Sequence, residues 1–212
     1  MNGTGVTRRR EGIVTSADAG LDAAVARIVE GGLALVVDEG RRRGDLVALA
    51  RSASPTGVNA MLAHGRGLVA VAMTADRRDR LELATMPGTS TPASIEASSG
   101  VTTGISAADR ALTIRTAADP AAGPGALISP GHVIPLVAAA GGLLSHRGRV
   151  EAAVDLARLA GSPAAAICEV LDETGALAEP AAIAALGVRI GAPLTTLAAI
   201  AERRVELAIG DW

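Results

Sequence analysis

The sequence of 212 residues contains no lysine, phenylalanine or tyrosine, and its only tryptophan is Trp212. All 20 basic residues are therefore arginine, which excludes Schiff-base chemistry on a lysine and a P-loop lysine. The lack of aromatic side chains excludes base stacking on aromatic platforms and predicts a core of Ala, Val, Leu and Ile. A GC-rich coding bias accounts for the missing lysine, so this absence is not evidence for a particular function.

Cysteine is also nearly absent. Cys168 is the only one, so no disulfide can form within the chain, and an intracellular location is expected. The net charge of −2 gives no general attraction to nucleic acid or anionic membranes. Residues 1–20 lack the apolar segment of a signal peptide, and no apolar run approaches the ~20 residues that span a membrane. We therefore expect a cytoplasmic protein without nucleic-acid or membrane partners.

The chain has the length and composition of one folded domain, with 49% hydrophobic and 20% charged residues. Residues 1–18 are small and polar and predict a mobile tail, which leaves residues 19–212 as the domain. Hydrophobic patterns predict helices at residues 21–30, 55–63, 106–117, 151–159 and 194–204, strands at 33–37, 46–50, 68–73 and 164–171, a short strand within 87–104, and an irregular connection at 119–131. This alternation without repeats predicts an α/β fold that is α+β-like.

Two charged features lie within this pattern. Residues 38–45 form a loop, DEGRRRGD, between two apolar runs. Its arginines are either a solvated surface or part of an anion-binding site. Glu169 lies inside an apolar strand, where an unpaired carboxylate is costly. It is either half of a buried ion pair or a general acid/base.

Five stretches occur in the order and at the spacing of a known family. They are residues 101–110 (VTTGISAADR), 130–136 (PGHVIPL), 141–142 (GG), 151–156 (EAAVDL) and 167–169 (ICE). Together they resemble the 3,4-dihydroxy-2-butanone 4-phosphate synthase family of the riboflavin pathway, across residues 21–204. The resemblance implies a single domain with a mixed sheet flanked by helices, a homodimer with its site near the dimer contact, and a magnesium-bound sugar phosphate.

Both metal-binding stretches depart from the family pattern. The family pattern D-D-E-x-R-E-N-E-G-D aligns with residues 38–45 if one residue is deleted, which puts Arg42 at the metal-binding Glu; without the gap, Arg41 takes that position. In the second pattern, R-x-G-H-T-E, Arg149 replaces the metal-binding His and His146 replaces the phosphate-binding Arg. Arginine repels a cation at neutral pH, so we expect no metal ligands.

The resemblance also implies roles for other residues. The expected catalytic residues are Glu169, Asp109, Ser106 and His132. The expected substrate-binding residues are Arg41, Arg42, Arg43, Asp45, Thr103, His146, Arg147 and Arg149. For Ser106 and Asp109 the alternative is a helix cap, for His132 a tight turn, and for His146 a surface position.

These observations leave three hypotheses for function. The first is a diverged, metal-independent lyase, dehydratase or isomerase that acts through an enolate on a small anionic carbonyl substrate, in specialised metabolism and without a cofactor. The second is the ordinary magnesium-dependent synthase, which converts ribulose 5-phosphate to dihydroxybutanone phosphate and formate, with a relocated metal site using Glu39, Asp45 or His146. The third is a non-catalytic protein that binds an anion or a partner.

Overall fold

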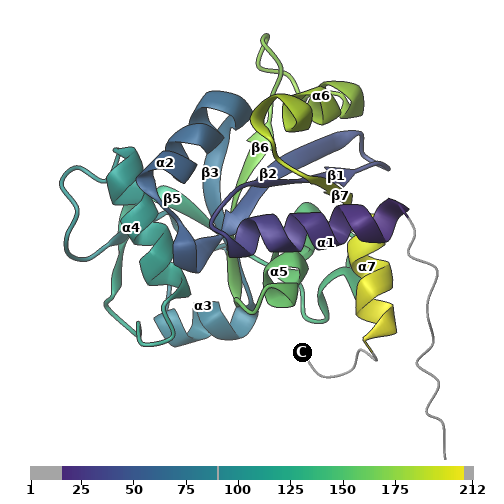
Figure 1. The fold of residues 1–212 in the computed structure, drawn as a ribbon. Helices are drawn as coiled ribbons and strands as arrows, with labels where there is room; N and C mark the ends of the chain where they lie inside the picture. The colour runs from purple at the N-terminus through teal and green to yellow at the C-terminus, as the bar shows by residue number, and fades with distance from the viewer. Residues whose placement is uncertain (1–15, 90, 208–212) are drawn as a thin grey trace, which may run out of the picture.

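The computed structural model describes residues 16–89 and 91–207, which form three layers with a sheet in the middle (Figure 1). The sheet has seven strands in the order β4-β5-β3-β6-β2-β1-β7. The strands are β1 (Ala34–Asp38), β2 (Arg43–Leu49), β3 (Arg66–Met73), β4 (Ile95–Ala97), β5 (Leu127–Val137), β6 (Ala164–Val170) and β7 (Leu194–Thr196). Both parallel and antiparallel neighbours occur, which confirms the expected α/β class and mixed sheet.

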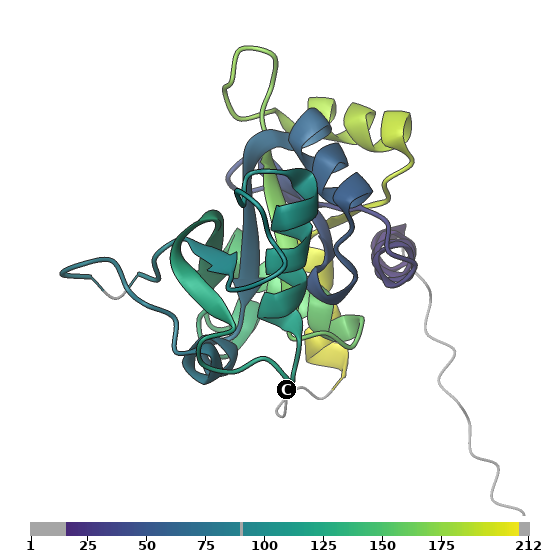
Figure 2. The same cartoon turned by 90° about the vertical axis from the view of Figure 1, so that its left-hand side faces the viewer.

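Helices cover both faces of the sheet (Figures 1 and 2). They are α1 (Ser16–Val29), α2 (Pro55–Ala60), α3 (Ala75–Leu81), α4 (Ala107–Ala118), α5 (Arg149–Leu159), α6 (Pro180–Ile190) and α7 (Leu197–Glu206). One buried cluster joins the sheet to α2, α4 and α6, and a second joins it to α1, α5 and α7. Strand alternation explains the division, because Leu46 and Ala48 face the first cluster whereas Val47 and Leu49 face the second.

The core is aliphatic, as the composition predicted. The largest fully buried side chains are all Leu, Ile or Met. Without aromatic rings, close packing rests on many small contacts. The alanines at 152, 153 and 157 in α5 and at 164–166 in β6 let these two elements approach closely. None of the described helices is long and apolar enough to cross a membrane.

The elements differ from the expected ones in several places. Helix α1 begins at Ser16 rather than at residue 21, and the predicted tail at residues 1–18 otherwise lies outside the described residues. The connection expected at residues 119–131 contains the start of β5, while α3 and α6 occupy segments for which no helix was predicted. The first three residues of the last predicted helix form β7.

Candidate active site

The first group of charged side chains, which we name the carboxylate–guanidinium cluster, consists of Arg43, Asp45, Arg149 and Glu169. Asp45 on β2 lies directly opposite Glu169 on β6. Arg149 is the first residue of α5. An Nη atom of Arg149 lies 2.5 Å from Asp45 Oδ1 and 3.8 Å from Glu169 Oε2. Arg43 approaches the other Glu169 oxygen at 3.5 Å. Strand pairing therefore brings residues over 100 positions apart into one ionic group.

Burial sets the protonation of this cluster. The Asp45 side chain is 4% exposed, and its desolvation raises its pKa to about 6, against the lowering effect of Arg149. The negative charge of Glu169 raises this pKa further. Asp45 is therefore arranged to hold or exchange a proton near neutral pH.

The loop between β1 and β2 meets the segment before α5. The side chain of Arg41 donates a hydrogen bond of 3.1 Å to the main-chain oxygen of Arg147 and lies 3.6 Å from Asp38. Arg42 instead pairs with Glu179, at 2.5 Å, on the surface. The expected convergence of arginines therefore includes Arg43 and Arg149, whereas the Arg42 side chain is held elsewhere.

A buried ion pair fixes the segment that carries His146, Arg147 and Arg149. Asp155 on α5 is fully buried and lies 2.9 Å from Arg204 on α7, which is 3% exposed. Asp155 Oδ2 also accepts a hydrogen bond of 2.8 Å from the Leu143 amide, and Arg204 donates to the Gly141 carbonyl at 2.6 Å. A side chain at Gly142 would collide with both charged groups.

His146 lies beside this segment and is paired with a carboxylate. His146 Nδ1 is 3.0 Å from Glu151 Oε2, and the other Glu151 oxygen accepts a hydrogen bond of 2.8 Å from the Ala139 amide. The His146 side chain is 59% exposed and Glu151 is 6% exposed. The buried carboxylate thus orients an imidazole whose outer part remains open to solvent.

The second group, which we name the histidine–carboxylate cluster, consists of Glu96, His132 and Asp109. Gly104 connects them, since its amide donates to Asp109 and a side chain at Gly104 would collide with the Glu96 carboxylate. His132 on β5 lies 2.8 Å from Glu96 on β4. Asp109 accepts hydrogen bonds from the Thr102 hydroxyl at 2.9 Å and from the Gly104 amide at 3.1 Å. The Thr102 hydrogen bond is the main reason that the pKa of Asp109 is lowered. Here carboxylates are balanced by neutral donors and an imidazole.

Ser106 and Asp109 also make the contacts of a helix cap. The Asp109 amide donates a 3.0 Å hydrogen bond to Ser106 Oγ at the start of α4, so the capping alternative describes Ser106. Thr103 is exposed, and no side-chain hydrogen bond of Thr103 occurs in the described part of the chain. His132 lies in a strand rather than a tight turn.

Both clusters lie at the same end of the sheet. The β3–β6 pairing is irregular between Arg66 and Val69, where Glu169 packs against Gly67, and on β5 His132 comes two residues before Ile134, the partner of Ala70. Asp45 and Glu169 lie on the α5 face, since Arg149 at the start of α5 approaches both side chains. Leu68 is 73% exposed, so this part of the face is open. His132 is two strands from Glu169, roughly 10 Å across the sheet.

Comparison with known proteins agrees with this geometry. A family model described as 3,4-dihydroxy-2-butanone 4-phosphate synthase matches residues 22–203. The chain belongs to this family. A 3,4-dihydroxy-2-butanone 4-phosphate synthase of Pseudomonas aeruginosa is 40% identical over 195 residues, which cover 87% of this chain and 53% of that protein. This chain thus spans about half the length of that relative.

Solved structures of the family have the same fold. A 3,4-dihydroxy-2-butanone 4-phosphate synthase in a cation-free form gives a TM-score of 0.83 at 32% identity, covering 89% of this chain and 98% of that one. Another, in complex with two magnesium ions, gives a TM-score of 0.80 at 32% identity, covering 87% and 96%.

The residues of the present site do not fit a magnesium ion. Magnesium prefers carboxylate and water oxygens in octahedral geometry, whereas Arg149 lies against Asp45 and Glu169. In the described part of the chain, no three His, Cys, Asp or Glu side chains are grouped so that they could hold a metal. The alternative ligands Glu39, Asp45 and His146 are likewise not brought together. A metal-free reaction stays a prediction.

Sequence reasoning missed four charged residues of these sites. Glu96 has the same signal as Glu169, a carboxylate between apolar strand residues, and could have been found in that way. Asp155 and Glu151 lie on the buried face of a helix that is otherwise rich in Ala, Val and Leu. Nothing in the sequence pairs Asp155 with Arg204, because their contact depends on how α5 packs against α7.

Proposed function

We propose that this chain is a lyase-type enzyme of the family in which arginine side chains, rather than magnesium, stabilise an anionic intermediate. The position of Arg149 carries the proposal. Its guanidinium contacts Asp45 and approaches Glu169 at the position where the family pattern has a metal-binding His. A permanent side-chain cation thus occupies the place of a dissociable one.

Glu169 is the proposed acid/base. Its side chain is 23% exposed, and its Oε2 atom lies 3.8 Å from Arg149, so the accessible part of the carboxylate can take a proton from the carbon beside a substrate carbonyl. The electron pair then moves to the carbonyl oxygen, and Arg43 or Arg149 stabilises the enolate. If the α-carbon carries a hydroxyl, transfer of the hydroxyl proton to the former carbonyl oxygen and of the carbon-bound proton to the former carbonyl carbon isomerises the substrate. Loss of hydroxide from the β-carbon, protonated to water by Glu169, instead dehydrates it.

The surrounding charges favour a small anionic substrate. Arg41, Arg43 and Arg149 lie at the junction of the two loops, and the positive end of the α5 dipole points to the same place. A carbonyl compound with a phosphate or carboxylate group fits this arrangement of cations beside a proton acceptor.

The comparisons favour a second candidate, the ordinary conversion of ribulose 5-phosphate in riboflavin biosynthesis. Relatives named for that synthase are about 40% identical to this chain, and this similarity supports the ordinary reaction at least as well as an altered one. The arginines at the ligand positions favour the first candidate, because the ordinary reaction of the family uses magnesium.

One pair of assays separates the candidates. Metal-free protein and protein with magnesium are incubated with ribulose 5-phosphate, and formate is measured. In parallel, exchange of substrate protons in D₂O is followed by NMR for a panel of small phosphorylated ketoses and 2-oxo acids. We expect no formate in either sample, and proton exchange that survives chelation. Magnesium-dependent formate release would establish the ordinary reaction, and exchange that needs magnesium would contradict the role of Arg149.

We also propose that the chain forms a homodimer in the cytoplasm, as the family resemblance implies. Light scattering across micromolar concentrations checks the assembly, and a monomer throughout that range contradicts it.

A further inference from the structure

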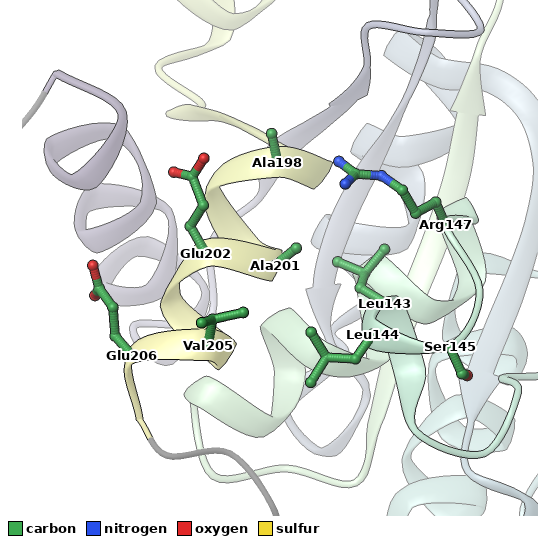
Figure 3. A pocket seen from close by; sticks show the side chains of 9 residues that line it. All are labelled: Leu143, Leu144, Ser145, Arg147, Ala198, Ala201, Glu202, Val205 and Glu206. Carbon is green, nitrogen blue, oxygen red and sulfur yellow. The ribbon is translucent and has the colours of Figure 1, made fainter.

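A cavity of about 580 Å³ lies between α7 and the segment before α5 (Figure 3). We name it the α7 groove. Its apolar wall consists of Leu143, Leu144, Ala198, Ala201 and Val205. Leu144 and Val205 are 45% and 60% exposed, so this wall is open to solvent. No residue of the carboxylate–guanidinium cluster lines the groove, which is a separate feature of the surface.

The charge around the groove is uneven. Arg147 lies at the end where α7 begins, and its guanidinium reaches toward Ala198 (Figure 3). Within the described residues, the Arg147 side chain has no ion pair or hydrogen bond; only its main-chain oxygen is engaged, by Arg41. Glu202 and Glu206 also line the groove, but their carboxylates point away from the two leucines (Figure 3).

We propose that the α7 groove binds a small amphipathic carboxylate, with its charged head at Arg147 and its alkyl chain on the apolar wall. An unpaired guanidinium is a specific partner for a carboxylate, and the N-terminal end of α7 adds positive potential at the same place. The opposite orientation would bring the carboxylate of the ligand near Glu202 and Glu206, whose negative charges repel it. Seven residues separate Ala198 from Val205, a length of ~10 Å along the helix, which suits a medium-chain acyl group.

The cavity is of a size that small-molecule sites share, and burying alkyl carbon against Leu143 and Leu144 supplies the driving force. The inference does not depend on the proposed reaction, since it names a binding site and not a chemical step. Occupancy would place an acyl carboxylate two residues from Arg149, at the edge of the candidate active site.

Calorimetry with octanoate, below its micelle concentration, tests the proposal on the full chain. We expect octanoate to bind, and acetate and octylamine not to bind, because each lacks one of the two features. Arg147→Gln should weaken octanoate binding at least about tenfold. Ala198→Leu, which fills the groove without changing charge, should weaken it as well. The control is Arg189→Gln, an exposed arginine on α6, which should bind as the wild type does.

Several outcomes overturn the proposal. These are no octanoate binding by the wild type, equal binding of octanoate and octylamine, and unchanged affinity in Arg147→Gln when circular dichroism shows that this variant is folded. If Leu144→Ser instead dissociates a dimer of the wild type, the groove is a contact between two copies and the carboxylate site is wrong.

Discussion

The two clusters at the same end of the sheet balance buried carboxylates in opposite ways. In the carboxylate–guanidinium cluster, Asp45 and Glu169 are surrounded by arginine cations. In the histidine–carboxylate cluster, Asp109 is held by a hydroxyl and backbone amides, and Glu96 by His132. In the first cluster, arginine cations offset the negative charge of the carboxylates. In the second cluster, the donors to Asp109 are neutral, so among the described residues its negative charge is not offset by a neighbouring cation.

The difference coincides with the departures from the family pattern. Asp109 and His132 lie in stretches that resemble the family pattern, whereas Arg149 stands where the resemblance predicts a metal-binding residue. Under the proposed function, one half of the site keeps its residue types while the charge of the other half is reversed. This comparison indicates that substrate positioning and charge stabilisation can change separately within one fold.

The largest effect is expected for Glu169→Gln. If Glu169 transfers the proton, substrate proton exchange should fall by roughly 10²–10⁴-fold, while binding of the anion changes little because the arginines remain. NMR in D₂O measures the exchange. Glu173→Gln, at an exposed position three residues beyond β6, is the matched control. Full exchange activity in Glu169→Gln would show that Glu169 is not the acid/base. The carboxylate–guanidinium cluster would then have no more evidence for proton transfer than the histidine–carboxylate cluster.

The second expectation concerns pH, where the two clusters should act with opposite signs. The raised pKa of Asp45, about 6, means that the folded state holds the proton more tightly. The free energy of unfolding should therefore fall as pH rises from ~4 to ~6, by at most about 3 kcal/mol. Asp109 has a lowered pKa, so its contribution is lost as pH falls toward and below the ordinary value of 3.8.

Urea unfolding between pH 3 and pH 8 checks this opposition. Asp45→Asn should remove the fall in stability between pH 4 and pH 6, and Asp109→Asn should remove part of the loss at acid pH. An unchanged profile in Asp45→Asn would show that Asp45 titrates as an ordinary aspartate, and the comparison of the clusters would lose its electrostatic basis.

The third expectation is a loss of stability in Arg149→Ala. Removing this guanidinium leaves Asp45 without its closest cation, which should lower the free energy of unfolding by roughly 2 kcal/mol at pH 8. The value is below that of a fully buried pair because Arg149 is 25% exposed. The loss should shrink at pH 5, where Asp45 can take up a proton. Arg158→Ala, in the last turn of the same helix, is the control and should cost less than 1 kcal/mol.

The smallest effect is expected from added phosphate. An anion that binds beside Arg43 and Arg149 should stabilise the folded state by about 1–2 kcal/mol at concentrations ten- to thirtyfold above its dissociation constant. Thermal unfolding with phosphate, compared with chloride at the same ionic strength, measures it. Arg43→Gln should reduce the stabilisation, whereas Arg189→Gln should not. Equal shifts in both variants would indicate nonspecific binding to arginines.

Much of the fold follows from the sequence, and the exceptions have identifiable causes. Apolar runs located β1, β2, β3 and β6, and Ser106 marked the start of α4. Strand β5 was missed because it contains Pro130 and Gly131, residues that are typical of turns. Helix α3 was missed because its buried face includes Arg77, whose guanidinium donates to main-chain oxygens at the end of α4. A charged residue in a buried position hides the periodicity.

The candidate site was predictable only in part. Arg43, Arg149 and Glu169 lie near one another in the structure, as their positions in the family alignment suggested, while their roles stay predictions. The direction of a long side chain is not encoded in that way. The Arg42 side chain pairs with Glu179, and the Arg147 side chain lies in the α7 groove. Both partners belong to segments far along the chain, and the family patterns say nothing about these contacts. Contacts of this kind depend on packing.

The ion pair of Asp155 and Arg204 has a consequence for how this enzyme family can change. It binds the backbone of Gly141 and Leu143 through hydrogen bonds. Asp155 and Arg204 themselves are not part of the carboxylate–guanidinium cluster. The side chains that follow can then be exchanged while the loop keeps its shape. Different residues hold the loop backbone and carry the side chains of the candidate site. The site residues can therefore be substituted, in evolution or by design, without loss of the contacts that hold the loop. Libraries at positions 146, 147 and 149 should accordingly retain folded protein far more often than libraries at positions 142, 155 and 204.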